Sequence, residues 1–167
     1  DFYGPRSQRP GDVTASFECR QAVPSPCTGG SGTGTWSNHA CQRGLGTLGE
    51  VVGYGQVAGP DPSLLTQPSR AILAALEGAG KSVADIDLFE LNEAFAAVGI
   101  ASMQDLGITD EVVNVNGGAI ALGHPVGMSG TRVALTPLHE LKRRGGGLGA
   151  AALCGGGGQG DAILLSV

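Results

Sequence analysis

Residues 86–125 read IDLFELNEAFAAVGIASMQDLGITDEVVNVNGGAIALGHP, and this stretch decides the fold. Its short apolar run at 86–91 predicts a strand, and the residues that follow, 92–106, have the spacing of a helix. Gly107 ends that helix, and a second strand is predicted at 112–115, before a glycine-rich loop. A strand, a helix and a second strand in this order are typical of an α/β fold.

The same alternation continues on both sides of this stretch. A strand is predicted at 49–58, and a helix follows between Pro68 and Gly80. A long helix is predicted at 127–144, with basic residues in its last turn.

Pro137 lies inside this long helix, so either the helix kinks there or Thr136 caps a second one. Two closing strands are predicted at 148–154 and 161–167, joined by a glycine turn short enough for antiparallel pairing. The chain therefore predicts a layered α/β/α domain with a mostly parallel sheet.

The chain changes character near residue 44. Residues 1–44 contain no Leu and no Ile and are rich in Gly and Pro, a composition that predicts disorder. Residues 45–167 carry all of the predicted elements and form the predicted domain. The abrupt change motivates the hypothesis that residues 1–44 are translated from a different reading frame than the rest. Translation of the same DNA in its other two frames tests this.

Composition excludes several classes of function. The formal net charge of −5 leaves no basic stripe, which argues against a nucleic-acid partner. No apolar run approaches the ~20 residues of a membrane helix, and no export signal is expected. Three of the four cysteines precede residue 45, with spacings that match neither a zinc site nor a disulfide framework. We therefore expect no metal site and a reducing cytoplasm.

Two glycine motifs can be set aside. Gly155, Gly157 and Gly160 match the dinucleotide fingerprint, but the helix and second strand that this fingerprint needs cannot follow in the seven residues after Gly160. The tripeptide Gly80-Lys81-Ser82 ends like a phosphate-binding loop, but the first glycine of that motif would fall within a helix.

Three polar residues stand at the ends of predicted strands or in glycine-lined loops: Asn92, His124 and Cys154. Ligands of α/β sheets usually bind at the ends of strands. Each residue also has a plainer interpretation. Asn92 could cap a helix, His124 could be a turn residue, and Cys154 could be an inert small apolar side chain before a hairpin turn. Their occurrence at equivalent places in one chain favours a shared site.

Three strings resemble motifs of the thiolase family: NEAFA at 92–96, NVNGGAIALGHP at 114–125 and CGGG at 154–157. The second string is long and specific. The resemblance covers residues 45–167 and corresponds to the family's C-terminal domain. Thiolases make or cleave the carbon–carbon bond between two acyl groups carried as coenzyme A thioesters, as when two acetyl-CoA form acetoacetyl-CoA.

The resemblance implies a role for each polar residue. His124 would be the base that activates a thiolate nucleophile, and it would also help to hold the thioester oxygen. Cys154 would remove the α proton of a second thioester and return a proton in cleavage. Asn92 would position a water in one oxyanion hole, and the backbone N–H of Gly156 would donate in the other.

The resemblance also implies the ligands. Ala94 and Phe95 would line the channel for the pantetheine arm of coenzyme A. Acyl-CoA and CoA would be substrates in lipid metabolism, with no permanently bound cofactor. Full-length members of the family are homodimers or homotetramers, and an isolated C-terminal domain would expose an apolar face. We therefore expect poor solubility or self-association.

One part of the family pattern is missing. The nucleophilic cysteine of thiolases lies in an N-terminal domain, within a Cys-Gly-Ser-Gly core that this sequence lacks. Cys27 is followed by Thr-Gly-Gly-Ser, and the flanks of Cys19 and Cys41 do not match either. The sequence therefore indicates a truncated thiolase-type acyltransferase that is inactive alone. The alternative is a non-catalytic half-domain that binds coenzyme A thioesters, or one half of a split enzyme.

Overall fold

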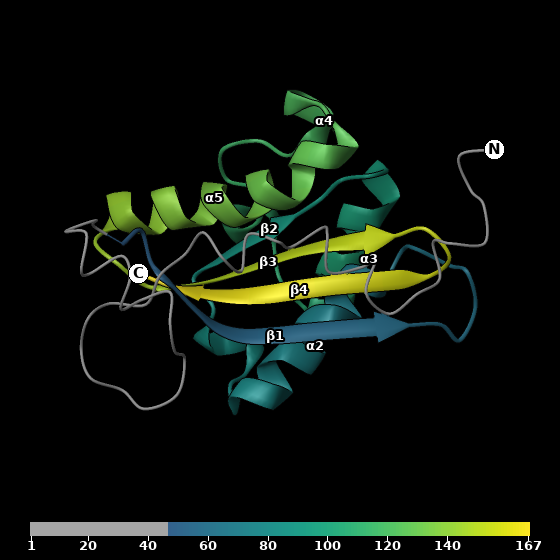
Figure 1. Ribbon diagram of the computed structural model, residues 1–167, viewed down its shortest axis with the longest axis horizontal. Helices are drawn as coiled ribbons and strands as arrows, with labels where there is room; N and C mark the ends of the chain where they lie inside the picture. Colours follow the sequence, from purple (N-terminus) through teal and green to yellow (C-terminus); the bar gives the residue numbers. More distant parts are fainter. Residues whose placement is uncertain (1–46) are drawn as a thin grey trace.

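A computed structural model describes residues 47–167 (Figure 1). The disorder predicted for residues 1–44 lies outside the described residues. The elements follow the chain in this order: β1 (Glu50–Ala58), α2 (Gln67–Ala79), a 3-10 helix (Val83–Asp85), β2 (Leu88–Leu91), α3 (Ala96–Leu106), a second 3-10 helix (Asp110–Val112), α4 (Ala119–Leu122), α5 (Val126–Arg144), β3 (Leu148–Gly155) and β4 (Gln159–Ser166).

The four strands form one mixed sheet in the order β1-β4-β3-β2. β2 and β3 are parallel, whereas β4 is antiparallel to both β3 and β1. The prediction of a mostly parallel sheet is therefore wrong in this respect. The glycine turn between β3 and β4 is too short for a crossover, which makes that pair antiparallel, and β1 then pairs with the free edge of β4.

Helices cover both faces of the sheet, as Figure 1 shows: α5 lies on one face, and α2 and α3 lie on the other. Each face has its own group of buried apolar side chains. On the α5 face, Val133 and Leu138 pack against Ile163 and Leu165. On the other face, Ile72 and Leu76 of α2 belong to a larger cluster. The layered α/β/α prediction is confirmed.

The helix predicted between Pro68 and Gly80 is α2, and it ends at Gly80 in the left-handed conformation. The helix lies directly on β1. A Cβ on Gly55 would come within 2.2 Å of the Ala71 carbonyl oxygen, so only glycine permits this approach. The pairing of β1 with β4 brings this helix close to the turn that follows Cys154.

The helix predicted at 92–106 begins four residues later, at Ala96. Asn92 N donates to Ala152 O at 2.9 Å, which continues the pairing of β2 with β3 beyond the last strand residue. A residue held in this way cannot start a helix, and Phe95 occupies the N-cap position instead. The plainer interpretation of Asn92 as a helix cap is therefore wrong.

The strand predicted at 112–115 is absent. A 3-10 helix (Asp110–Val112) takes its place, and a single bridge joins Val113 to Phe89. Asn114 then turns the chain with φ = 47°. Its side-chain oxygen accepts from Leu91 N at 2.8 Å, and its Nδ2 donates to Leu91 O at 3.0 Å. One amide group thus makes the two hydrogen bonds that a neighbouring strand would make to Leu91.

The long helix α5 continues without a break through Pro137. The Thr136 hydroxyl donates to Arg132 O at 2.9 Å, one turn back, and does not cap a second helix. Arg132 itself is oriented toward the sheet. The residues after the helix reverse at Gly145, whose φ of 97° is left-handed.

Candidate active site at the edge of the sheet

The ends of β2 and β3 bring the predicted site residues to one edge of the sheet. The two strands are parallel neighbours, so their carboxyl ends lie together. The backbone of Asn92 is bonded to Ala152, two residues before Cys154. The His124 ring approaches from the loop before α5, with its Nε2 3.4 Å from Asn92 Nδ2. Asn92 and His124 are therefore in contact, and Cys154 is the penultimate residue of the adjacent strand β3.

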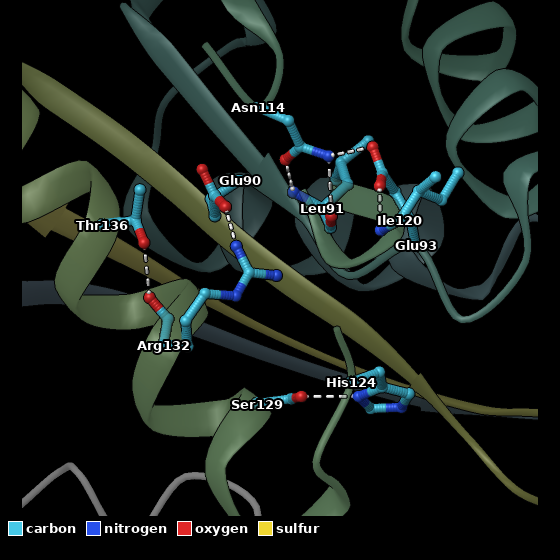
Figure 2. A network of polar contacts seen from close by, with 9 residues as sticks. All are labelled: Glu90, Leu91, Glu93, Asn114, Ile120, His124, Ser129, Arg132 and Thr136. Carbon is cyan, nitrogen blue, oxygen red and sulfur yellow. Dashed lines mark hydrogen bonds and ion pairs between the residues drawn. The ribbon is translucent and has the colours of Figure 1, made fainter. Parts of the chain in front are cut away.

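Ser129 fixes the protonation pattern of the His124 ring. The Ser129 oxygen lies 3.1 Å from Pro125 O and 2.5 Å from His124 Nδ1 (Figure 2). Both contacts are hydrogen bonds when the hydroxyl donates to Pro125 O and accepts from Nδ1. In the neutral ring, Nδ1 then carries the proton and Nε2 keeps a lone pair, which faces the Asn92 amide. The ring is exposed, whereas Ser129 is buried.

No role for Ser129 was predicted from the sequence. Its signal is spacing: Pro125 precedes the first turn of α5, and Ser129 N donates to Pro125 O at 3.0 Å. A serine in the first turn after a His-Pro pair faces back toward the histidine.

The side-chain oxygen of Asn92 is a hydrogen-bond acceptor without a partner among the described residues. The Asn92 side chain is almost wholly buried, with 1% exposure, and its Oδ1 has no hydrogen-bond partner within residues 47–167. A buried amide oxygen without a partner costs free energy, roughly 1–3 kcal/mol. Such an atom suits a site that orders a water or a polar ligand group.

Cys154 is a free, half-buried thiol at the end of β3. Burial raises its pKa above the ordinary value, so the thiol form dominates near neutral pH. Gly156 is exposed in the turn that follows, and a Cβ placed on it would meet no atom within 4 Å. The glycine run is thus also a hairpin turn, as the plainer interpretation had it.

The turn after Cys154 is held by the loop that follows β1. Gly59 N donates to Gly158 O at 2.9 Å. A Cβ on Gly158 would lie 2.1 Å from Asp61 O, so the two backbones touch at this point. This contact fixes where Gly156 stands relative to the sheet edge.

Exposed and half-exposed apolar residues lie near Asn92 and His124 in the sequence. Ala94 is half-buried and Phe95 is 63% exposed, directly after Asn92. Around His124, three further side chains are exposed: Ile120, Leu122 and Val126, the last at 85%. An exposed apolar surface of this kind beside polar groups is typical of a binding or association surface.

A buried ion pair joins the two elements that carry the site. Glu90 of β2 pairs with Arg132 of α5 (Figure 2), and the Glu90 side chain is 3% exposed. Burial raises the pKa of Glu90 to about 7, although the Arg132 charge opposes this rise. Arg132 Nε and Nη2 have no partner among the described residues. Glu90 precedes Asn92 by two residues, and Arg132 lies about one helical turn after Ser129 in α5.

Residues 47–167 contain no group of three His, Cys, Asp or Glu side chains placed to hold a metal ion. Over the same range, no helix is both long and apolar enough to cross a membrane.

The mixed sheet, its two helical layers and the Asn, His and Cys at one edge define a layered α/β domain with a polar site at its strand ends. Residues 45–167 match the family described as thiolase, C-terminal domain. This chain belongs to the thiolase family.

Similar proteins include the probable acetyl-CoA acetyltransferase of Mycobacterium tuberculosis, which is 56% identical over 75% of this chain and 32% of its own length. The cytosolic acetyl-CoA acetyltransferase of Rattus norvegicus is 52% identical over 74% of this chain and 31% of its own. The chain thus spans about one third of the length of these relatives.

Solved structures show the same likeness. The Bacillus anthracis acetyl-CoA acetyltransferase superposes with a TM-score of 0.74 and 42% identity, over 79% of this chain and 34% of that one. Human mitochondrial 3-ketoacyl-CoA thiolase, solved in complex with CoA, gives a TM-score of 0.73 and 43% identity, over 77% and 33%.

Proposed function

We propose that this chain supplies the acid–base part of a thiolase-type acyltransferase site, which joins or cleaves acyl groups carried as coenzyme A thioesters. The observation that carries the proposal is the His124 ring, which Ser129 and Asn92 hold with the Nε2 lone pair toward the site. The names of the relatives and the CoA complex of one structural neighbour support the substrate class.

His124 acts first in this proposal. Its Nε2 takes the proton of a cysteine thiol that is supplied from outside the described residues, and the resulting thiolate attacks the thioester carbonyl. The imidazolium that forms keeps its Nδ1–H bond to Ser129, so the ring does not rotate during the transfer. A histidine with Nδ1 engaged in this way has only one nitrogen available as the base.

Cys154 transfers a proton to or from the α carbon of the acyl-CoA. In cleavage, its thiol protonates the α carbon of the departing acyl-CoA, and the raised pKa keeps that proton in place near neutral pH. In condensation, the Cys154 thiolate removes the α proton of the second thioester, and an enolate forms. Burial makes the thiolate rarer but a stronger base.

Oxyanions form at both carbonyl groups and need donors. The buried Asn92 amide would hold a water against the enolate oxygen, and the unpartnered Asn92 Oδ1 fits such a water. The backbone N–H of Gly156, an exposed residue, would donate to the other oxyanion. Ala94 and Phe95 would contact the pantetheine arm, which their exposure beside Asn92 permits.

The nucleophile would come from a longer form of this chain or from a separate polypeptide. A mixture experiment tests this. The 167-residue chain is combined with the N-terminal two thirds of the Mycobacterium tuberculosis relative, and thiolysis of acetoacetyl-CoA by CoA is followed by absorbance. We expect turnover from the mixture and none from the chain alone. His124→Ala should abolish it, while the exposed His139→Ala on α5 should leave it unchanged.

Other results would redirect the proposal. Turnover by the chain alone that survives Cys→Ser changes at Cys19, Cys27 and Cys41 would contradict an external nucleophile. A mixture that binds acetyl-CoA but does not turn over would favour the non-catalytic half-domain. We also propose a cytoplasmic location, in line with the cytosolic rat relative. Fractionation of the native host with an antibody to residues 47–167 tests it.

A further inference from the structure

Glu93 connects the two segments that carry Asn92 and His124. It directly follows Asn92, and its two carboxylate oxygens accept from different donors (Figure 2). Oε1 accepts from Asn114 Nδ2 at 2.8 Å. Oε2 accepts from Ile120 N at 2.9 Å. Ile120 lies in α4, four residues before His124.

The segment between Asn114 and His124 depends on such anchors because its backbone is irregular. Gly117 and Gly123 have φ values of 87° and 90°, which flank the single turn of α4. Within the turn, Leu122 N donates to Gly118 O and Gly123 N to Ala119 O. These bonds are local and do not fix the turn relative to β2.

The Glu93 carboxylate packs directly on Gly118. A Cβ at Gly118 would lie 2.4 Å from Glu93 Cδ and 2.5 Å from Asn114 Nδ2. The backbone of the turn therefore rests on the carboxylate and on the amide that binds it. The geometry requires glycine at 118 because of Glu93, and not because of φ at that position.

From these contacts we infer that Glu93 is a positioning residue, whose carboxylate sets the loop at 117–123 and thereby the place of His124 against Asn92. The expected effect of Glu93 on catalysis rests on the proposed function, but its effect on the position of the loop does not. A carboxylate is required, because both partners are N–H donors and each needs an acceptor. A glutamine has the same shape but a single oxygen, so its amide nitrogen would face one of the two donors.

The test compares Glu93→Gln with Glu111→Gln, the same chemical change at an exposed position in the neighbouring 3-10 helix. Amide hydrogen exchange is measured by NMR in the 167-residue chain. Loss of one charge-assisted hydrogen bond should speed exchange at Ile120 by roughly tenfold or more. Exchange in β3 and β4 should not change, and Glu111→Gln should leave Ile120 as it is.

The second readout is the contact of His124 with Asn92. We expect the nuclear Overhauser effect between the His124 ring and the Asn92 side-chain amide to be lost in Glu93→Gln and kept in Glu111→Gln. In the mixture assay, Glu93→Gln should lower kcat more than it raises KM, since the acyl-CoA contacts remain.

Two results would overturn the inference. One is wild-type exchange at Ile120 together with a retained His124–Asn92 signal in Glu93→Gln. The other is an equal acceleration of exchange across β3, β4 and Ile120, because Glu93 would then act on the stability of the whole domain. The NMR measurements need no turnover. They therefore test this inference even if the mixture assay shows no activity and the proposed function fails.

Discussion

Replacing Ser129 by alanine separates the orientation of His124 from its chemistry. The substitution removes one oxygen atom and the two hydrogen bonds that it makes, to His124 Nδ1 at 2.5 Å and to Pro125 O at 3.1 Å. The serine is buried, so water does not readily replace the hydroxyl. The free energy of unfolding should fall by about 1–2 kcal/mol.

The larger effect should be on the ring. Without an acceptor at Nδ1, the tautomer protonated at Nε2 becomes competitive, and this tautomer has no lone pair facing Asn92. Misplacement of a catalytic base commonly costs 10- to 100-fold in rate, and we expect a loss of about that size in kcat of the mixture. The ¹⁵N shifts of the His124 ring report the tautomer directly and need no turnover.

Ser102→Ala is the matched control. Ser102 is also fully buried, but it lies in α3, and its hydroxyl bonds Leu65 O at 3.3 Å. This variant should lose stability to a similar extent and keep both the His124 shifts and kcat. If Ser129→Ala keeps the wild-type tautomer and full kcat, the assignment of Nε2 as the base side of the ring is refuted.

Four further predictions follow from packing, charge and exposure. Gly55→Ala should lower the free energy of unfolding, measured by urea titration, by ~2 kcal/mol or more, because its Cβ would meet the α2 backbone. Gly78→Ala, where a Cβ meets open space, should instead raise it by ~0.5–1 kcal/mol. Because burial raises the pKa of Glu90 from 4.5 to about 7, the folded state keeps a proton that the unfolded state has released. Stability should therefore fall as pH rises through that window, and a flat Tm there would count against it. Alkylation of Cys154 by iodoacetamide, followed by peptide mass spectrometry, should reach half its maximal rate at a pH above that of a free cysteine; a lower midpoint would be inconsistent with its burial. The chain should self-associate in sedimentation experiments, and Val126→Asp should weaken this; a monomeric wild-type chain would contradict it.

Sequence patterns predicted the helices and strands whose bounds are determined by residues close to them in the chain. β1, α2 and α5 appear close to their expected bounds, because apolar spacing and left-handed glycines such as Gly80 and Gly145 determine where each begins or ends. The glycine turn between β3 and β4 was likewise visible. These signals depend on a few neighbouring residues.

The failures have tertiary causes. The start of α3 shifts because Asn92 N bonds a strand that lies 60 residues away. The strand at 112–115 is missing because the Asn114 side chain takes the two backbone groups that a strand would pair with. Neither contact can be read from local spacing.

Some residues of the candidate site were likewise predicted from the sequence, and others were recognised only in the structure. Asn92, His124 and Cys154 were found from their places at strand ends and from the family motifs, and the contact of Asn92 with His124 agrees with a shared site. Ser129 and Glu93 act through other residues, so their parts became visible only with the hydrogen-bond geometry. Their roles, like those of Gly156, Ala94 and Phe95, stay predictions until the variants are measured.

The strand order also constrains how the domain is made in the cell. β1 and β2 leave the ribosome early, but the structure pairs neither with the other: β1 binds β4, and β2 binds β3. β2 must wait for β3 (residues 148–155) and β1 for β4 (residues 159–166) before either can form its ladder. Until then, their backbone groups and apolar faces remain exposed on a nascent chain, where chaperones can bind them. The central strands β3 and β4 are therefore synthesised last, and the edge strands β1 and β2 can pair only with them.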